Sequence, residues 1–108
     1  MDEMREEDCD CPEVEIPDGA IHGEFLIVNK KGLHARATAK FVQCASNFDA
    51  EITVTRCGET VGATSIMGIL TLGAGIGSTI TVVARGADAQ PALNALEALI
   101  ADKFGEGE

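Results

Sequence analysis

A chain of 108 residues has room for one small domain, because a hydrophobic core needs most of such a chain to close around it, and this length excludes a long solenoid. Apolar residues make up 45% of the chain and charged residues 24%, which is typical of a globular protein. The formal charge of −10, without a basic stripe carrying interleaved aromatic residues, disfavours nucleic acid as a partner.

The acidic residues are concentrated at the N-terminus. Residues 1–19 contain nine Asp or Glu against Arg5, a net charge of −8, which leaves −2 for the rest of the chain. Such a segment buries too little apolar surface to offset its ordering entropy, so we expect a disordered acidic tail at 1–19 and one folded domain at 20–108. The chain has no run of about 18 apolar residues and no signal peptide pattern, so we expect a cytoplasmic protein without membrane contact.

The four cysteines, Cys9, Cys11, Cys44 and Cys57, are expected to be free thiols, because a chain without an export signal stays in a reducing compartment. The Cys9-Asp10-Cys11 motif invites a metal site. However, the chain offers no second close pair of Cys or His, and the neighbouring carboxylates disfavour the thiolate form that binds metals. We therefore expect neither a metal ion nor another cofactor.

The first predicted elements are a strand, a helix and a hairpin. Residues 21–29 are rich in β-branched side chains and end in polar residues, which predicts a strand. Over residues 35–46 apolar side chains recur every three or four positions, which predicts a helix with one buried face. The alternation over residues 51–55, followed by a turn and a weak strand around Val61, predicts a hairpin.

The second half of the chain repeats this alternation. The apolar run 65–72 predicts a short helix, although periodicity alone does not distinguish it from a buried strand. Residues 78–85 alternate as a strand, and Asp88 is expected to cap a final helix that ends at Gly105. The order β-α-β-β-α-β-α predicts an α+β fold, in which an antiparallel sheet is covered by helices on one face.

The residues that could take part in a chemical reaction lie at the start of the first predicted helix, in the motif Gly32-Leu33-His34-Ala35-Arg36. A histidine at this position lies beside backbone N–H groups that have no partner within the helix. A neutral imidazole is a nucleophile near pH 7, and these N–H groups together with Arg36 could hold the oxygens of a phosphoryl group bound to it. The pair is chemically sufficient for reversible phosphoryl capture, and the alternative is a surface pair at a helix cap.

This motif, together with Thr64-Ser65-Ile66-Met67-Gly68-Ile69-Leu70 about thirty residues later, closely resembles the HPr family of histidine phosphocarriers of the bacterial phosphotransferase system. The resemblance covers about residues 24–104 and implies an open-faced β-sandwich, with a four-stranded antiparallel sheet and three helices on one face. Residues 47–51 look more like the nitrogen-type carriers, called NPr. The family usually has Pro directly after the Arg, where this chain has Ala37.

The resemblance also implies roles for individual residues. His34 would accept a phosphoryl group on Nδ1 from Enzyme I, which takes it from phosphoenolpyruvate, and pass it to an EIIA protein with Arg36 as the assisting cation. Ser65 would be the position phosphorylated by an HPr kinase/phosphorylase. The patch on which partners dock would consist of Ile66, Met67, Ile69 and Leu70, of which we expect two to be core residues.

Two other functions stay open. One is a regulatory binding module of the HPr fold, which acts through its phosphorylation state and docking without onward transport. The other is a scaffold domain in which His34 and Arg36 only cap a helix and the acidic tail binds partners. An acid-labile, alkali-stable adduct formed with phosphoenolpyruvate and Enzyme I would separate phosphoryl transfer from the scaffold.

Overall fold

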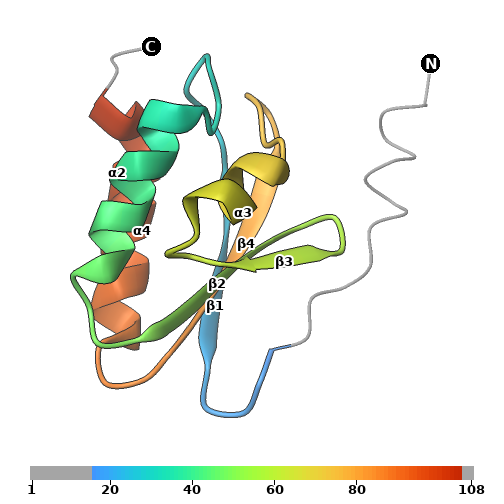
Figure 1. The fold of residues 1–108 in the computed structure, drawn as a ribbon. Coiled ribbons are helices and arrows are strands. Elements are labelled where there is room, and N and C mark those ends of the chain that lie inside the picture. The colour runs from blue at the N-terminus through green and yellow to red at the C-terminus, as the bar shows by residue number, and fades with distance from the viewer. Residues whose placement is uncertain (1–15, 106–108) are drawn as a thin grey trace.

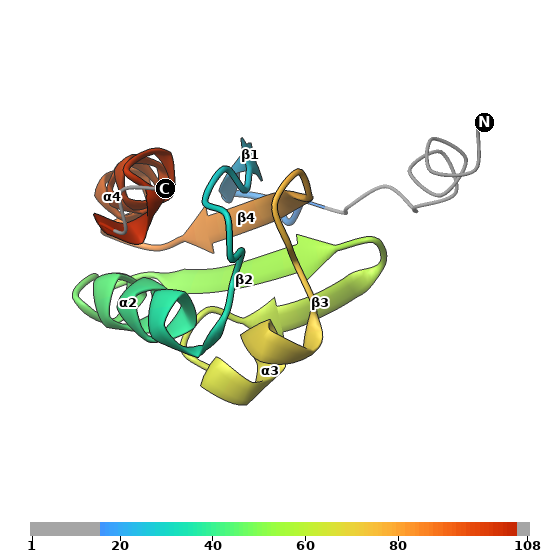
Figure 2. The same ribbon diagram turned by 90° about the horizontal axis from the view of Figure 1, so that it is seen from above.

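The structure, a computed structural model, describes residues 16–105, which form a sheet with helices packed on one of its faces (Figures 1 and 2). The helices α2 and α4 lie side by side, and α3 covers the part of the sheet that carries the hairpin (Figure 2). The elements in chain order are β1 (Ile21–Leu26), α2 (Ala35–Ser46), β2 (Glu51–Arg56), β3 (Glu59–Gly62), α3 (Ile66–Thr71), β4 (Thr79–Arg85), α4 (Ala89–Ala101) and the 3₁₀ helix η1 (Lys103–Gly105). This order confirms the predicted α+β open-faced sandwich.

The four strands form one antiparallel sheet in the order β1-β4-β2-β3. Thr81 of β4 faces Glu24 of β1 on one side and Thr55 of β2 on the other. Thr55 in turn faces Thr60 of β3, and the two hydroxyl oxygens lie 2.7 Å apart. Because side chains alternate along a strand, this polar row lies on the face opposite the core.

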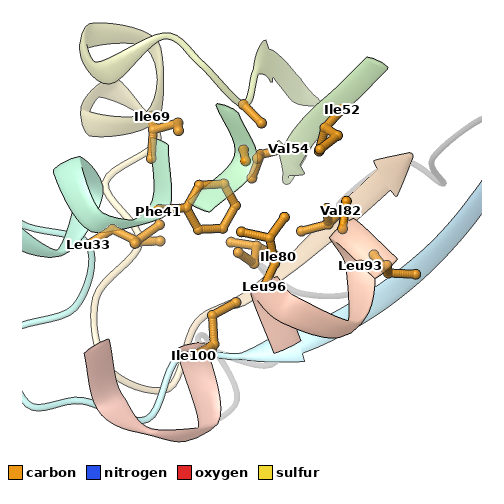
Figure 3. Packing of buried hydrophobic residues seen from close by; sticks show 14 of the residues in the cluster. Leu33, Phe41, Ile52, Val54, Ile69, Ile80, Val82, Leu93, Leu96 and Ile100 are labelled. Carbon is orange, nitrogen blue, oxygen red and sulfur yellow. The ribbon is translucent and has the colours of Figure 1, made fainter. Parts of the chain in front are cut away.

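The core lies between the sheet and the helices and draws one or more side chains from each helix (Figure 3). Phe41 of α2, Ile69 of α3 and Leu96 of α4 are fully buried in one cluster with Ile80 and Val82 of β4. Burial of a side chain of this kind stabilises a fold by about 1.5–3 kcal/mol relative to leaving it exposed. None of the described helices is long and apolar enough to cross a membrane.

The first strand ends at Leu26, three residues earlier than predicted. Ile27 still pairs in sheet fashion, since its N–H donates a hydrogen bond to the carbonyl oxygen of Ser78 at 2.8 Å. Asn29, however, is fully buried, and its side-chain amide donates to the carbonyl oxygen of Gly32 at 2.8 Å. The strand therefore gives way to a turn that is held by a buried polar side chain.

The last helix ends at Ala101 and does not reach Gly105 as predicted. Lys103 and Phe104 both have left-handed backbone angles, with φ of 55° and 56°. This sharp turn places the Phe104 ring in the core, and Lys40 Nζ donates to the Phe104 carbonyl oxygen at 2.6 Å. Burial of an aromatic ring therefore ends the helix before the glycine.

Asp88 is the N-cap residue of α4 as predicted, but its carboxylate does not accept a hydrogen bond from that helix. Asp88 Oδ2 accepts instead from the backbone N–H of Asp49 at 2.8 Å, and the Asp88 N–H donates to the Asp49 carbonyl oxygen at 3.0 Å. Asp88 therefore ties the start of α4 to the loop that precedes β2.

The expectation of four free thiols is wrong, because Cys57 is disulfide-bonded. Pairing depends on which sulfur atoms the fold brings together, and a missing export signal does not report this. Cys44 is a free thiol, and its partial burial raises its pKa. Cys9 and Cys11 lie outside the described residues. Within residues 16–105, no cluster of three His, Cys, Asp or Glu side chains could hold a metal ion.

Candidate functional site

The candidate site is built on the loop that connects β1 to α2. Gly32 in this loop has a φ of +66°, in the left-handed region that favours glycine. A Cβ atom at Gly32 would lie 2.6 Å from both the Ala74 carbonyl oxygen and the Gly75 Cα atom. Next to it, the Leu33 N–H donates to the same Ala74 oxygen at 2.8 Å. The loop is therefore packed directly against the backbone of the segment before β4.

Two buried polar side chains brace the same loop from the other side. Asn29 holds the Gly32 carbonyl, as described above, and Thr38 Oγ1 donates to the Leu33 carbonyl oxygen at 3.2 Å. Both side chains are fully buried, where an unmade hydrogen bond would be costly. Asn29 and Thr38 escaped prediction, because Asn29 begins a polar run and Thr38 lies between Arg36 and Lys40, so the sequence does not mark either side chain as buried. They fix the backbone that leads into His34.

His34 is the N-cap residue of α2, and its extended backbone turns the imidazole back over the first turn of the helix. Its Nδ1 atom accepts a hydrogen bond from the backbone N–H of Arg36 at 3.3 Å. An acceptor nitrogen carries a lone pair, so in the neutral ring Nδ1 is the nucleophilic atom and Nε2 carries the proton. His34 is half-buried.

The first turn of α2 supplies donors around this imidazole. The first intrahelical hydrogen bond runs from the Thr38 N–H to the His34 carbonyl oxygen at 2.8 Å. The N–H groups of residues 35–37 therefore have no acceptor within the helix, and the helix end carries a partial positive charge. Arg36 lies in this turn, and its side chain is exposed. The arrangement can receive an anionic group at Nδ1 and hold its oxygen atoms with backbone N–H groups and a guanidinium.

Ser65 is the N-cap residue of α3, where its Oγ atom accepts a hydrogen bond from the Gly68 N–H at 3.1 Å. A Cβ atom at Gly68 would lie 3.0 Å from the Val61 Cβ atom, so α3 packs closely on β3. Ser65 is exposed, so its hydroxyl is accessible to solvent although it also caps α3. The short helix predicted from the run 65–72 is confirmed, with Ser65 as its cap.

The four residues of the expected docking patch separate into two kinds. Met67 is 72% exposed and Ile66 is 42% exposed, whereas Leu70 is half-buried. Ile69 has no exposed surface and packs in the core, so no partner can touch it in this conformation. Ile69 is therefore removed from the docking patch, because the face of α3 on which it lies is turned toward the sheet. Ile66 and Met67 remain as the exposed apolar surface of α3.

The chain matches the family model described as "PTS HPr component phosphorylation site" over residues 21–102. It is 56% identical to the phosphocarrier protein HPr of Cupriavidus necator over 85 residues, which cover 79% of this chain and 96% of that protein. It is 49% identical to the phosphocarrier protein NPr of Shewanella violacea, over 77% of this chain and 91% of that one.

Solved structures agree with these matches. The phosphocarrier HPr of Bacillus anthracis superposes with a TM-score of 0.74 at 43% identity, over 77% of this chain and 99% of that one. The HPr protein of Thermoanaerobacter tengcongensis superposes with a TM-score of 0.77 at 45% identity, over 80% of this chain and 97% of that one. The chain therefore belongs to the HPr family of phosphocarrier proteins of the phosphotransferase system.

Proposed function

We propose that this member of the HPr family accepts a phosphoryl group on His34 Nδ1 from Enzyme I and passes it to an EIIA protein. The observation that carries this proposal is the hydrogen bond from the Arg36 N–H to His34 Nδ1, which directs the lone pair to that nitrogen. The relatives named phosphocarrier proteins support the same activity. Residues 20–108 form the phosphocarrier domain in this proposal, and the protein acts in the cytoplasm.

Transfer proceeds by attack of the Nδ1 lone pair on the phosphorus atom, while the bond from phosphorus to the donor breaks. Nε2 keeps its proton, and the phosphoryl oxygens balance the positive charge that this leaves on the ring. Once Nδ1 is bonded to phosphorus it no longer accepts from Arg36 N–H, so that N–H can turn to a phosphoryl oxygen. The Arg36 guanidinium adds a charge-assisted contact to the group in transit.

The donor and the acceptor dock on the exposed apolar residues of α3, Ile66 and Met67, with Leu70 at their edge. Ser65 lies directly before them and is the proposed site of regulation by an HPr kinase/phosphorylase. Added phosphate would place about two negative charges beside this apolar surface and oppose docking. We further propose that the chain has a nitrogen-type, regulatory role, which its similarity to the NPr protein supports.

The experiment is incubation of the protein with phosphoenolpyruvate and Enzyme I, followed by detection of an acid-labile, alkali-stable phosphate adduct. We expect wild type to take up one phosphoryl group and His34→Ala to take up none while keeping its fold. His22→Ala is the matched control, since His22 is an exposed histidine on β1 opposite Val83. Retained incorporation in His34→Ala would place the site elsewhere, and addition of an EIIA protein tests onward transfer.

A further inference from the structure

The backbone on both sides of His34 is held by one buried residue, Thr38. The Thr38 hydroxyl donates to the Leu33 carbonyl oxygen at 3.2 Å, and the Thr38 N–H donates to the His34 carbonyl oxygen at 2.8 Å. These two carbonyl groups belong to the two peptide planes that meet at the His34 Cα atom. Because the orientations of these planes define φ and ψ, Thr38 restrains both backbone angles of His34, which are −81° and −178°.

The contact from Thr38 to Leu33 spans five residues, whereas a Thr hydroxyl inside a helix usually reaches back three or four. Leu33 directly precedes the N-cap of α2, and Thr38 is the fourth residue of that helix. In many helices apolar side chains at these two positions pack together and fix the angle at which the chain enters the helix. Here the Leu33 side chain lies in the core instead (Figure 3), and the Thr38 hydroxyl makes the contact to its carbonyl.

The contact between the His34 imidazole and the helix is sensitive to these angles. The hydrogen bond from Arg36 N–H to His34 Nδ1 measures 3.3 Å, at the long end of the range for such bonds. A modest rotation of the His34 backbone would therefore break it. A neutral imidazole without this donor can carry its proton on either nitrogen, and Nδ1 would then no longer be reserved for the lone pair.

We propose that Thr38 is a positioning residue for phosphoryl transfer. It fixes the backbone of His34 at the angles that place Nδ1 on the Arg36 N–H, and it thereby selects Nδ1 as the nucleophilic nitrogen. Thr38 itself has no exposed surface, so it acts only through His34 and does not touch the phosphoryl group. The effect on transfer rests on the proposed function, whereas the position of the imidazole proton is a property of the protein alone.

The first test measures the ¹⁵N chemical shifts of the His34 ring by NMR at about pH 9, where an ordinary imidazole is neutral. Wild type should carry the proton on Nε2. Thr38→Val keeps the shape of the side chain but removes the donor to Leu33, so the two nitrogen shifts should move toward each other as both tautomers become populated. Thr38→Ser retains a hydroxyl and should keep the wild-type pattern.

Thr55→Val is the matched control for this measurement. Thr55 is also a buried threonine, and its hydroxyl oxygen lies 2.7 Å from that of Thr60 on the opposite face of the sheet. The substitution therefore removes a comparable hydrogen bond away from His34, and it should leave the His34 ring shifts unchanged. Wild-type shifts in Thr38→Val, or equal changes in Thr38→Val and Thr55→Val, would overturn the proposal.

The second test measures phosphorylation by Enzyme I in rapid-quench experiments, at a temperature where circular dichroism shows every variant to be folded. Thr38→Val should lower the maximal rate about two- to tenfold, the range that corresponds to one neutral hydrogen bond. The Enzyme I concentration at half-maximal rate should not change, because the exposed side chains of Ile66 and Met67 are untouched. Thr38→Ser and Thr55→Val should both keep the wild-type rate.

An unchanged maximal rate in Thr38→Val would overturn the role of Thr38 in transfer. An effect only on the concentration at half-maximal rate would assign Thr38 to docking and overturn this role as well. Absence of phosphorylation in wild type would refute the proposed function, while the ring shifts would still decide whether Thr38 controls the position of the imidazole proton.

Discussion

Replacement of Gly32 by Ala tests how closely the His34 loop is packed. The substitution places a side chain at a φ of +66°, which costs an L-residue about 1–2 kcal/mol. The new Cβ atom would also lie 2.6 Å from two backbone atoms, Ala74 O and Gly75 Cα, which cannot rotate away as a side chain can. Overpacking of this kind costs about 1–3 kcal/mol. Gly32→Ala should therefore lower the free energy of unfolding by about 2–4 kcal/mol, after a small gain from a stiffer unfolded chain.

Gly73→Ala is the matched control for this prediction. Gly73 has a φ of +65°, but nothing lies within 4 Å of the position of its Cβ atom. The control shares the backbone cost without the clash, so it should cost about 1 kcal/mol or less. The difference between the two variants measures the close approach of the His34 loop to Ala74.

Thermal unfolding followed by circular dichroism gives the comparison. For a domain of this size about 1 kcal/mol corresponds to about 4–8 °C, so Gly32→Ala should melt at least about 10 °C below wild type and well below Gly73→Ala. At a temperature where both variants are folded, Gly32→Ala should also accept phosphate more slowly, because the clash displaces the backbone that leads to His34. Equal melting temperatures for the two variants would refute the inferred packing.

Three further predictions concern single side chains. Arg36→Ala should slow phosphoryl acceptance by about one to two decades, because a charge-assisted hydrogen bond worth about 1.5–3 kcal/mol is lost. Its melting temperature should not change, because the Arg36 side chain is exposed. An unchanged acceptance rate in rapid-quench measurements would contradict this role of Arg36. Ser65→Asp should keep the fold, because Asp is a good N-cap, but it should slow acceptance of phosphate from Enzyme I. Ser65→Ala should keep the rate of phosphate acceptance and lose about 0.5–2 kcal/mol of stability. Equal acceptance rates for Ser65→Asp and wild type would argue against regulation at Ser65. Because burial raises the pKa of Cys44, the folded protein holds less Cys44 thiolate at pH 8 than the unfolded chain does. Iodoacetamide should therefore modify Cys44 more slowly in the native protein, as measured by mass spectrometry of the Cys44 peptide. Equal modification rates in the native and unfolded protein would contradict the burial of Cys44.

The sequence by itself determined the features that depend on near neighbours. Apolar spacing predicted the two long helices and the main strands, because helix and strand periods are properties of consecutive residues, whereas spacing alone left the short helix at residues 65–72 ambiguous. The contact from Arg36 N–H to His34 Nδ1 spans only two residues, and the cap from Ser65 Oγ to Gly68 N–H spans three. Both sites could therefore be identified from the sequence as caps of predicted helices.

Only the tertiary structure decided features that join distant parts of the chain. The lack of space at Gly32 comes from Ala74, and the early end of α4 comes from burial of Phe104, whose carbonyl oxygen binds Lys40. Periodicity in the six residues of α3 did not reveal which apolar side chain faces the sheet, and packing assigned Ile69 to the core. Such contacts depend on how elements far apart in sequence meet, and local spacing carries no information about that meeting.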